Sequence, residues 1–133
     1  MDKINCILLA DENVSNTFLV YKLLRKLNLS DSIHIVRGGT NALSFVQDFA
    51  RANNNACPEL IIINSKIVKS DGSLFLDLIC QNTFANKHNV KILVTGKLAE
   101  PIEHKDVILL EEPVTKENLL KAIGNLGFKT FAA

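Results

Sequence analysis

The chain has 133 residues, the size of one ordinary domain, so we do not expect a catalytic domain joined to a separate output or DNA-binding domain. Its residues are 47% hydrophobic and 22% charged, which is typical of a packed globular protein rather than a disordered one. The net charge is +1, and the basic residues are scattered, so nucleic acid and membrane surfaces are not expected partners.

Targeting signals are not evident in the sequence. The first residues lack the plan of a signal peptide, and no apolar run reaches the length of a membrane span. Cys6, Cys57 and Cys80 are odd in number and form no C-x-x-C motif or Cys/His cluster, which argues against a disulfide framework or a zinc site. We therefore expect a cytoplasmic protein.

Short apolar runs alternate along the chain with longer segments of helical period. The runs predict strands buried on both faces of a parallel sheet, and they cover residues 7–9, 33–36, 60–63, 92–94 and 107–110. Apolar residues at i, i+3, i+4 and i+7 predict helices that include residues 20–27, 42–49 and 119–126. Five strands joined by right-handed helical crossovers predict a three-layer, doubly wound α/β domain.

Helix starts and one short connection complete this prediction. Asn13 or Ser15 is the expected N-cap of the first helix, Thr40 that of the second and Thr115 that of the last. Only twelve residues, 95–106, connect the fourth strand to the fifth, and they include Pro101. The fourth helix is therefore predicted to be shortened.

Polar residues follow the apolar runs at the carboxyl ends of four predicted strands. They are Asp11 and Glu12 after the first, Asn64 after the third, Thr95 after the fourth and Glu112 after the fifth. In open parallel sheets, ligands bind beyond these strand ends, near the point where the strand order reverses. We therefore expect these side chains to converge on one rim.

Four segments, taken in order, resemble the receiver domain of two-component response regulators, the CheY-like family. They are residues 7–13 (ILLADEN), residues 58–64 (PELIIIN) with Asp71 and Gly72 beyond them, residues 93–96 (LVTG), and Glu112 with Pro113. The resemblance covers residues 3–126 and implies the flavodoxin-like strand order 2-1-3-4-5. It implies a receiver-like domain over residues 1–127, followed by a C-terminal tail of residues 128–133.

The resemblance also implies roles for the rim residues. Asp11 and Glu12 match the acidic pair that holds Mg²⁺, and Asn64 stands at the position of the aspartate that accepts phosphate from a histidine kinase. Thr95 matches the hydroxyl that reads the phosphoryl group. Glu112 stands where the family has its lysine, before a proline whose peptide bond is usually cis.

Two departures from the family pattern affect residues that phosphoryl transfer requires. An acyl phosphate forms only if a carboxylate attacks phosphorus, and the amide of Asn64 is no substitute nucleophile. Glutamate at position 112 brings repulsion where the transferred phosphoryl group needs a cation. We therefore expect a degenerate receiver that is not an enzyme and requires no cofactor. It would act by contact with a histidine kinase or another signalling protein of a two-component system.

Several alternatives remain open at this stage. Asp11 and Glu12 can still bind Mg²⁺, or the ammonium of Lys66 can take the place of the metal. Glu112 can equally be a solvated side chain that never enters the pocket. Asp71 could serve as a displaced phosphate acceptor in a conventional phosphorelay receiver. A small metal- or ligand-binding α/β domain would predict a closed cleft, whereas an interaction module predicts a shallow pocket and an exposed apolar patch.

Overall fold

A computed structural model describes residues 3–53, 58–67, 90–97 and 106–128. Its elements are β1 (Ile7–Ala10), α1 (Val14–Leu27), β2 (Ile33–Val36), α2 (Gly39–Ala52), β3 (Leu60–Asn64), α3 (Ser65–Ile67), β4 (Lys91–Thr95), β5 (Val107–Leu110) and α6 (Lys116–Asn125). Several predictions lie outside the described residues: the shortened fourth helix, Asp71, Cys57, Cys80 and tail residues 129–133.

The described strands form one five-stranded parallel sheet in the order β2-β1-β3-β4-β5. This confirms the predicted doubly wound α/β fold and its strand order. β1 lies between β2 and β3, so that Ala10 is in register with Val36 on one side and Ile63 on the other. Asn64 and Thr95 are register partners at the ends of β3 and β4. The carboxyl ends of these strands therefore meet at one edge of the sheet.

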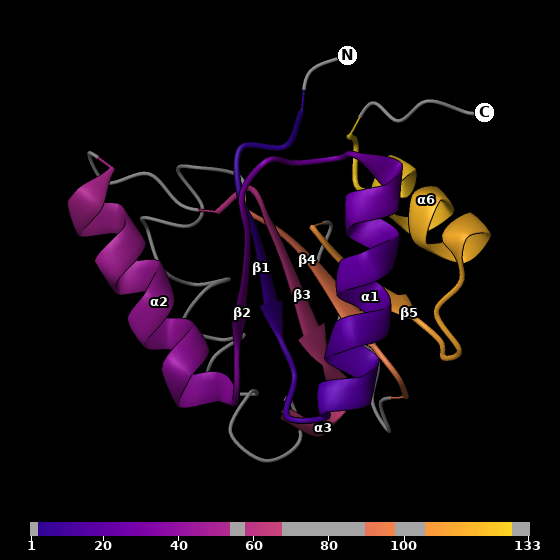
Figure 1. The fold of residues 1–133 in the computed structure, drawn as a ribbon, viewed down its shortest axis with the longest axis horizontal. Helices are drawn as coiled ribbons and strands as arrows, with labels where there is room; N and C mark the ends of the chain where they lie inside the picture. Colours follow the sequence, from indigo (N-terminus) through magenta and orange to yellow (C-terminus); the bar gives the residue numbers. More distant parts are fainter. Residues whose placement is uncertain (1–2, 54–57, 68–89, 98–105, 129–133) are drawn as a thin grey trace.

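Helices cover both faces of the sheet, with α1 and α6 on one side and α2 on the other (Figure 1). Successive side chains along a strand point to opposite faces of the sheet, so alternate residues pack into the two hydrophobic layers, one on each face. In β1, Ile7 and Leu9 pack in the layer of α1 and α6, whereas Leu8 and Ala10 pack in the layer of α2. Phe128 packs partly against the α1 and α6 layer.

Local capping confirms two of the predicted helix starts and corrects one. Asn13 caps α1 by accepting a hydrogen bond from the Asn16 backbone, and Thr115 caps α6 in a capping box with Asn118. The prediction of Thr40 as the N-cap is wrong, because α2 begins at Gly39 and its N-cap lies two residues before Thr40. Gly38, with a φ of 84°, occupies its N-cap position, so the chain turns directly from β2 into the helix there.

The amino ends of β4 and β5 are joined by an ion pair between Lys91 and Asp106, both largely buried. This pair lies at the opposite end of the strands from the polar rim, where it ties two neighbouring strands together. None of the helices in the described ranges is both long and apolar enough to cross a bilayer.

Candidate functional site

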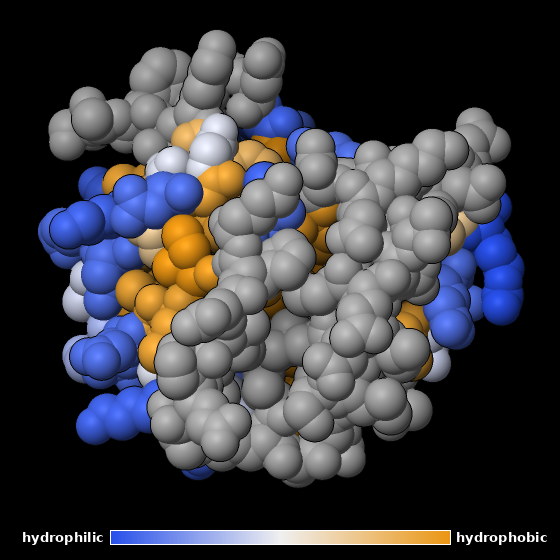
Figure 2. Space-filling model, turned by 180° about the vertical axis from the view of Figure 1, so that it is seen from behind, coloured by the Kyte–Doolittle hydropathy of each residue, from blue (hydrophilic) through white to orange (hydrophobic). Residues whose placement is uncertain are grey.

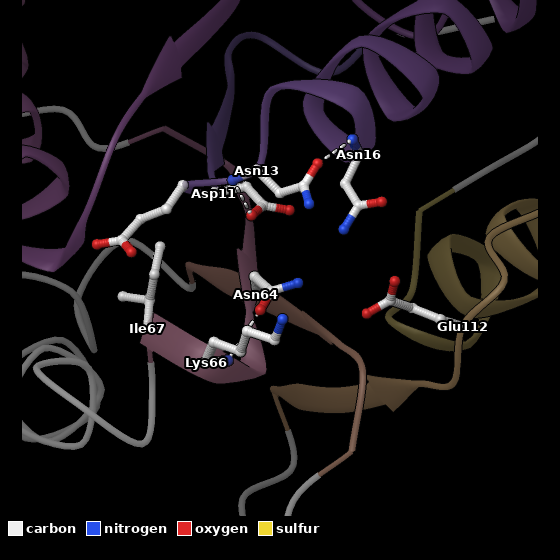
Figure 3. Close-up of a pocket in the computed structure, with 8 residues that line it drawn as sticks. Asp11, Asn13, Asn16, Asn64, Lys66, Ile67 and Glu112 are labelled. Carbon is white, nitrogen blue, oxygen red and sulfur yellow. Dashed lines mark hydrogen bonds between the residues drawn. The ribbon is translucent and has the colours of Figure 1, made fainter.

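An open, polar pocket lies at the carboxyl ends of β1 and β3, with a volume of about 290 Å³ (Figure 3). It is lined by Asp11, Glu12, Asn13, Asn16, Asn64, Lys66, Ile67 and Glu112. The pocket thus brings together four of the five rim residues and the lysine that was considered as an internal cation. Asp11 and Glu12 come close to Asn64 and Lys66 because β1 and β3 are direct neighbours, whereas Glu112 comes from the loop after β5.

Short turns fix the two central side chains of the pocket. Asp11 Oδ1 accepts a hydrogen bond of 2.9 Å from the Asn13 backbone N–H, two residues along the chain. Asn64 Oδ1 accepts one of 2.8 Å from the Lys66 backbone N–H in the same way. These turns hold both side chains at the carboxyl ends of their strands. The carboxamide oxygen of Asn64 is therefore already hydrogen-bonded within the local turn.

The electrostatics of the pocket disfavour the charged form of Asp11. Burial raises the pKa of this carboxyl above its ordinary value, because Asp11 is only 8% exposed and water reaches it poorly. The nearby carboxylate of Glu112 raises the pKa as well, while the backbone hydrogen bond from Asn13 and the ammonium of Lys66 lower it. Burial and Glu112 together outweigh the opposing groups.

Glu112 enters the pocket from the loop that follows β5, and its carboxylate points toward Asp11 and Asn64 (Figure 3). The residue is exposed and lines the pocket at the same time. Its Oε1 lies 3.2 Å from the position that a Cβ would take on Gly96. The Glu112–Pro113 peptide bond is cis, as expected from the resemblance.

Thr95 is the rim residue that the structure leaves out of the pocket lining. It is the last residue of β4 and is 5% exposed, beside Asn64 in the sheet. Gly96, which follows it, donates a backbone hydrogen bond of 2.9 Å to the Leu110 carbonyl. Thr95 is therefore positioned next to the pocket floor, within the sheet.

Comparisons with known proteins bear on this geometry. No family model matches the chain. A curated relative, the response regulator Rcp1 of Synechocystis, is 29% identical over 90 residues, which cover 68% of this chain but only 61% of the relative. A two-component response regulator structure from Cytophaga hutchinsonii has a TM-score of 0.75 at 20% identity and covers 94% of this chain and 98% of that one.

Two further solved structures have a similar fold. The bacteriophytochrome response regulator RtBRR has a TM-score of 0.75 at 21% identity, covering 98% of this chain and 82% of its own. The chemotaxis response regulator CheY4 of Vibrio cholerae has a TM-score of 0.70 at 18% identity, covering 93% and 99%. The chain has the receiver-domain fold. In a receiver fold of this strand order, the pocket at β1 and β3 is where the strand order reverses.

Three residues of this receiver-fold pocket were not predicted as site residues. Asn13 was predicted only as a helix cap, while Asn16 and Ile67 were not considered. Asn16 lies three positions beyond Asn13 at the start of α1, and its backbone N–H bonds to the Asn13 side chain at 3.0 Å. Asn16 could have been predicted from its spacing, because a residue three positions after an N-cap lies close to that cap.

Glu12 and Glu112 both line the pocket but lie beside different turns. Glu12 Oε1 lies 3.7 Å from the Cβ position of Gly38, in the turn after β2, whereas Glu112 lies by Gly96 after β4. Within the described part of the chain, no three His, Cys, Asp or Glu side chains gather closely enough to hold a metal ion. The ammonium of Lys66 lowers the pKa of the Asp11 carboxyl.

Proposed function

We propose that this chain is a receiver-like signalling module of a two-component or phosphorelay system that acts by protein contact and is not phosphorylated at position 64. The observation that carries the proposal is the carboxamide of Asn64 at the centre of the pocket, with its oxygen bonded to the Lys66 backbone. An aspartyl phosphate requires a carboxylate oxygen that attacks phosphorus while the donor's leaving group departs. A carboxamide lacks that nucleophile.

The charges around the pocket support the same conclusion. Among the described residues that line the pocket, Asp11, Glu12 and Glu112 contribute three carboxylates and Lys66 contributes one ammonium. A transferred phosphoryl group carries negative charge that cations must stabilise as it moves. With Glu112 aimed into the pocket, an incoming phosphodonor would meet repulsion in place of attraction.

The expected partners are signalling proteins, such as a histidine kinase or another component of the same system. Similarity to proteins named as response regulators supports this class of partner. The role needs no cofactor and no catalytic residue, because a binding surface is sufficient for it. The buried strands form the core beneath that surface.

The alternative of a small ligand-binding domain predicts a closed cleft around its ligand. The observed pocket is open, and four of its lining residues are solvent-exposed: Glu12, Asn13, Lys66 and Glu112. Large apolar side chains are also exposed elsewhere on the surface. This combination favours an interaction module.

Incubation of the full chain with acetyl phosphate and Mg²⁺, followed by intact-mass measurement, tests the proposal. The expected mass is unchanged. A stoichiometric, base-labile gain of one phosphate would overturn the claim, and peptide mapping would then show whether the acceptor is Asp71, the site of the displaced-acceptor alternative.

A further inference from the structure

A second hollow lies away from the polar pocket, between α1 and the edge strand β2. Its volume is about 220 Å³, and it is lined by Val14, Thr17, Phe18, Tyr21, Ile35 and Arg37. β2 is the edge strand at one end of the sheet order, and α1 covers one face of the sheet (Figure 1). This α1–β2 groove is thus formed by one side of a helix and the border of the sheet.

The walls of the α1–β2 groove are apolar and exposed. Val14 is 59% exposed, Phe18 61% and Ile35 45%, which are high values for large hydrophobic side chains. Val14, Phe18 and Tyr21 are spaced at i, i+4 and i+7, so they form one stripe along α1. Exposed apolar surface that is contiguous and lines a hollow marks an interaction site rather than scattered surface residues.

The charged residue that lines the groove is cationic and a second cation lies beside it, whereas the Glu12 carboxylate, close to Gly38, lines the polar pocket. Arg37 lines the groove, and Lys22 Nζ lies 5.3 Å from the centroid of the Phe18 ring. Among the described residues, no carboxylate forms an ion pair with Arg37 or Lys22. The charged residues of α1 itself are all basic, since Lys22, Arg25 and Lys26 have no acidic counterpart in the helix. A complementary partner therefore needs carboxylates beside its apolar contacts.

We propose that the α1–β2 groove binds an amphipathic helix of a partner protein, with apolar side chains against Phe18 and Ile35 and carboxylates near Arg37 and Lys22. A concave hollow beside a ridge of i, i+4 and i+7 side chains suits a helix, whose own side chains can enter it, better than a lipid surface. The inference rests on the proposed function in one respect only, that the module acts by protein contact.

The chain offers matched controls for a test. Phe18→Ser removes the most exposed apolar wall, and Leu19→Ser changes the next residue of α1, which is 46% exposed but does not line the groove. Arg37→Glu reverses the groove cation, and Lys26→Glu reverses an exposed cation of α1 outside the lining. Other exposed apolar side chains serve as a further control. Figure 2, which views the molecule from behind, shows apolar surface on the half of the molecule that holds α6. Leu109→Ser, at a 42% exposed residue of β5, is a control distant in the sheet order.

The probe is a fluorescent helical peptide of the same length as α1, with Leu residues on one stripe and Glu residues beside them. A second peptide carries Gln in place of Glu, and vesicles of anionic phospholipid form a separate arm. Anisotropy measures binding to the full chain and each variant, and thermal unfolding confirms that each variant is folded. Sedimentation of the chain alone tests whether a second copy occupies the groove.

We expect the Glu peptide to bind, with affinity about tenfold weaker for Phe18→Ser and severalfold weaker for Arg37→Glu, and unchanged for the three controls. The Gln peptide should bind several times more weakly, and added salt should reduce the difference. Equal binding of both peptides, no binding of the Glu peptide, binding only to vesicles, or self-association lost in Phe18→Ser would each overturn the assignment. None of these results depends on phosphorylation, so failure here is distinguishable from failure of the proposed function.

Discussion

The Glu112 carboxylate points across the pocket toward Asp11 and raises the pKa of the Asp11 carboxyl (Figure 3). The two residues come from loops after β5 and β1, strands that are separated in the sheet by β3 and β4. Two acidic groups therefore oppose each other where the receiver resemblance implies an acid and a lysine. This relationship affects the ionisation of Asp11, and it supports the proposal that the pocket does not carry out phosphotransfer.

The first prediction concerns the titration of Asp11. Burial and Glu112 raise its pKa, while Lys66 lowers it. Glu112→Gln should therefore lower the pKa of Asp11 toward its ordinary value, and Lys66→Ala should raise it further. Carboxyl-carbon NMR titration of Asp11 in the wild type and both variants checks this. A pKa that is the same in all three would contradict the arrangement of charges described above.

A second prediction links Asp11 to stability. Because the folded-state pKa is raised, the folded protein holds the Asp11 proton more tightly than the unfolded chain does. The associated stability is present below the ordinary pKa of an aspartate and is lost as pH rises through the raised folded value. Asp11→Asn removes this titration and retains an oxygen that can accept from the Asn13 backbone.

Asp11→Asn should therefore be more stable than the wild type near neutral pH, and the advantage should shrink in acid, where the wild-type carboxyl is protonated in both states. Urea unfolding of both proteins at several pH values measures this difference. An advantage that stays constant with pH, or grows toward acid, would show that Asp11 does not carry a raised pKa in the folded state.

A third prediction concerns the turn after β4. Gly96 has a φ of 109°, and a Cβ there would collide with Ser65 Oγ and lie 3.2 Å from Glu112 Oε1. Gly127 has a similar φ of 100°, but a Cβ there would meet nothing within 4 Å. Alanine at either position should cost about 1–3 kcal/mol of unfolding free energy from backbone strain.

Gly96→Ala should be the more destabilising of the two, because it adds the steric conflict with Ser65. Ser65→Gly in the Gly96→Ala background should recover part of that excess. Denaturant unfolding of the four proteins measures it. If Gly96→Ala and Gly127→Ala lose equal stability, the close approach of Ser65 and Glu112 to Gly96 is not present in solution.

The strands could be predicted closely from the sequence. The apolar runs at 33–36 and 107–110 coincide with β2 and β5, and the other three runs fall within one residue of β1, β3 and β4 at each end. Strands buried on both faces leave this continuous apolar signal. The start of α2 was missed because Gly38, rather than the expected hydroxyl of Thr40, occupies the N-cap position through its positive φ.

The site could be predicted only in part. Asp11 follows β1 directly and Asn64 is the last residue of β3, so the pairing of these two strands alone brings them together. The direction of a side chain in a loop is set by its neighbours in space, which sequence periodicity does not report. For this reason the inward approach of Glu112 remained undecided from sequence. The α1–β2 groove was also not predicted, since Ile35 and Phe18 meet only through tertiary packing.

The most direct test compares the wild type with the double variant Asn64→Asp/Glu112→Lys, using acetyl phosphate, Mg²⁺ and intact-mass measurement in one experiment. The double variant regains both a carboxylate nucleophile and a cation, so we predict that it gains one base-labile phosphate while the wild type gains none. A phosphate gain on the wild type would contradict the central claim. Failure of the double variant, if it remains folded, would show that these two residues are not what removes phosphotransfer.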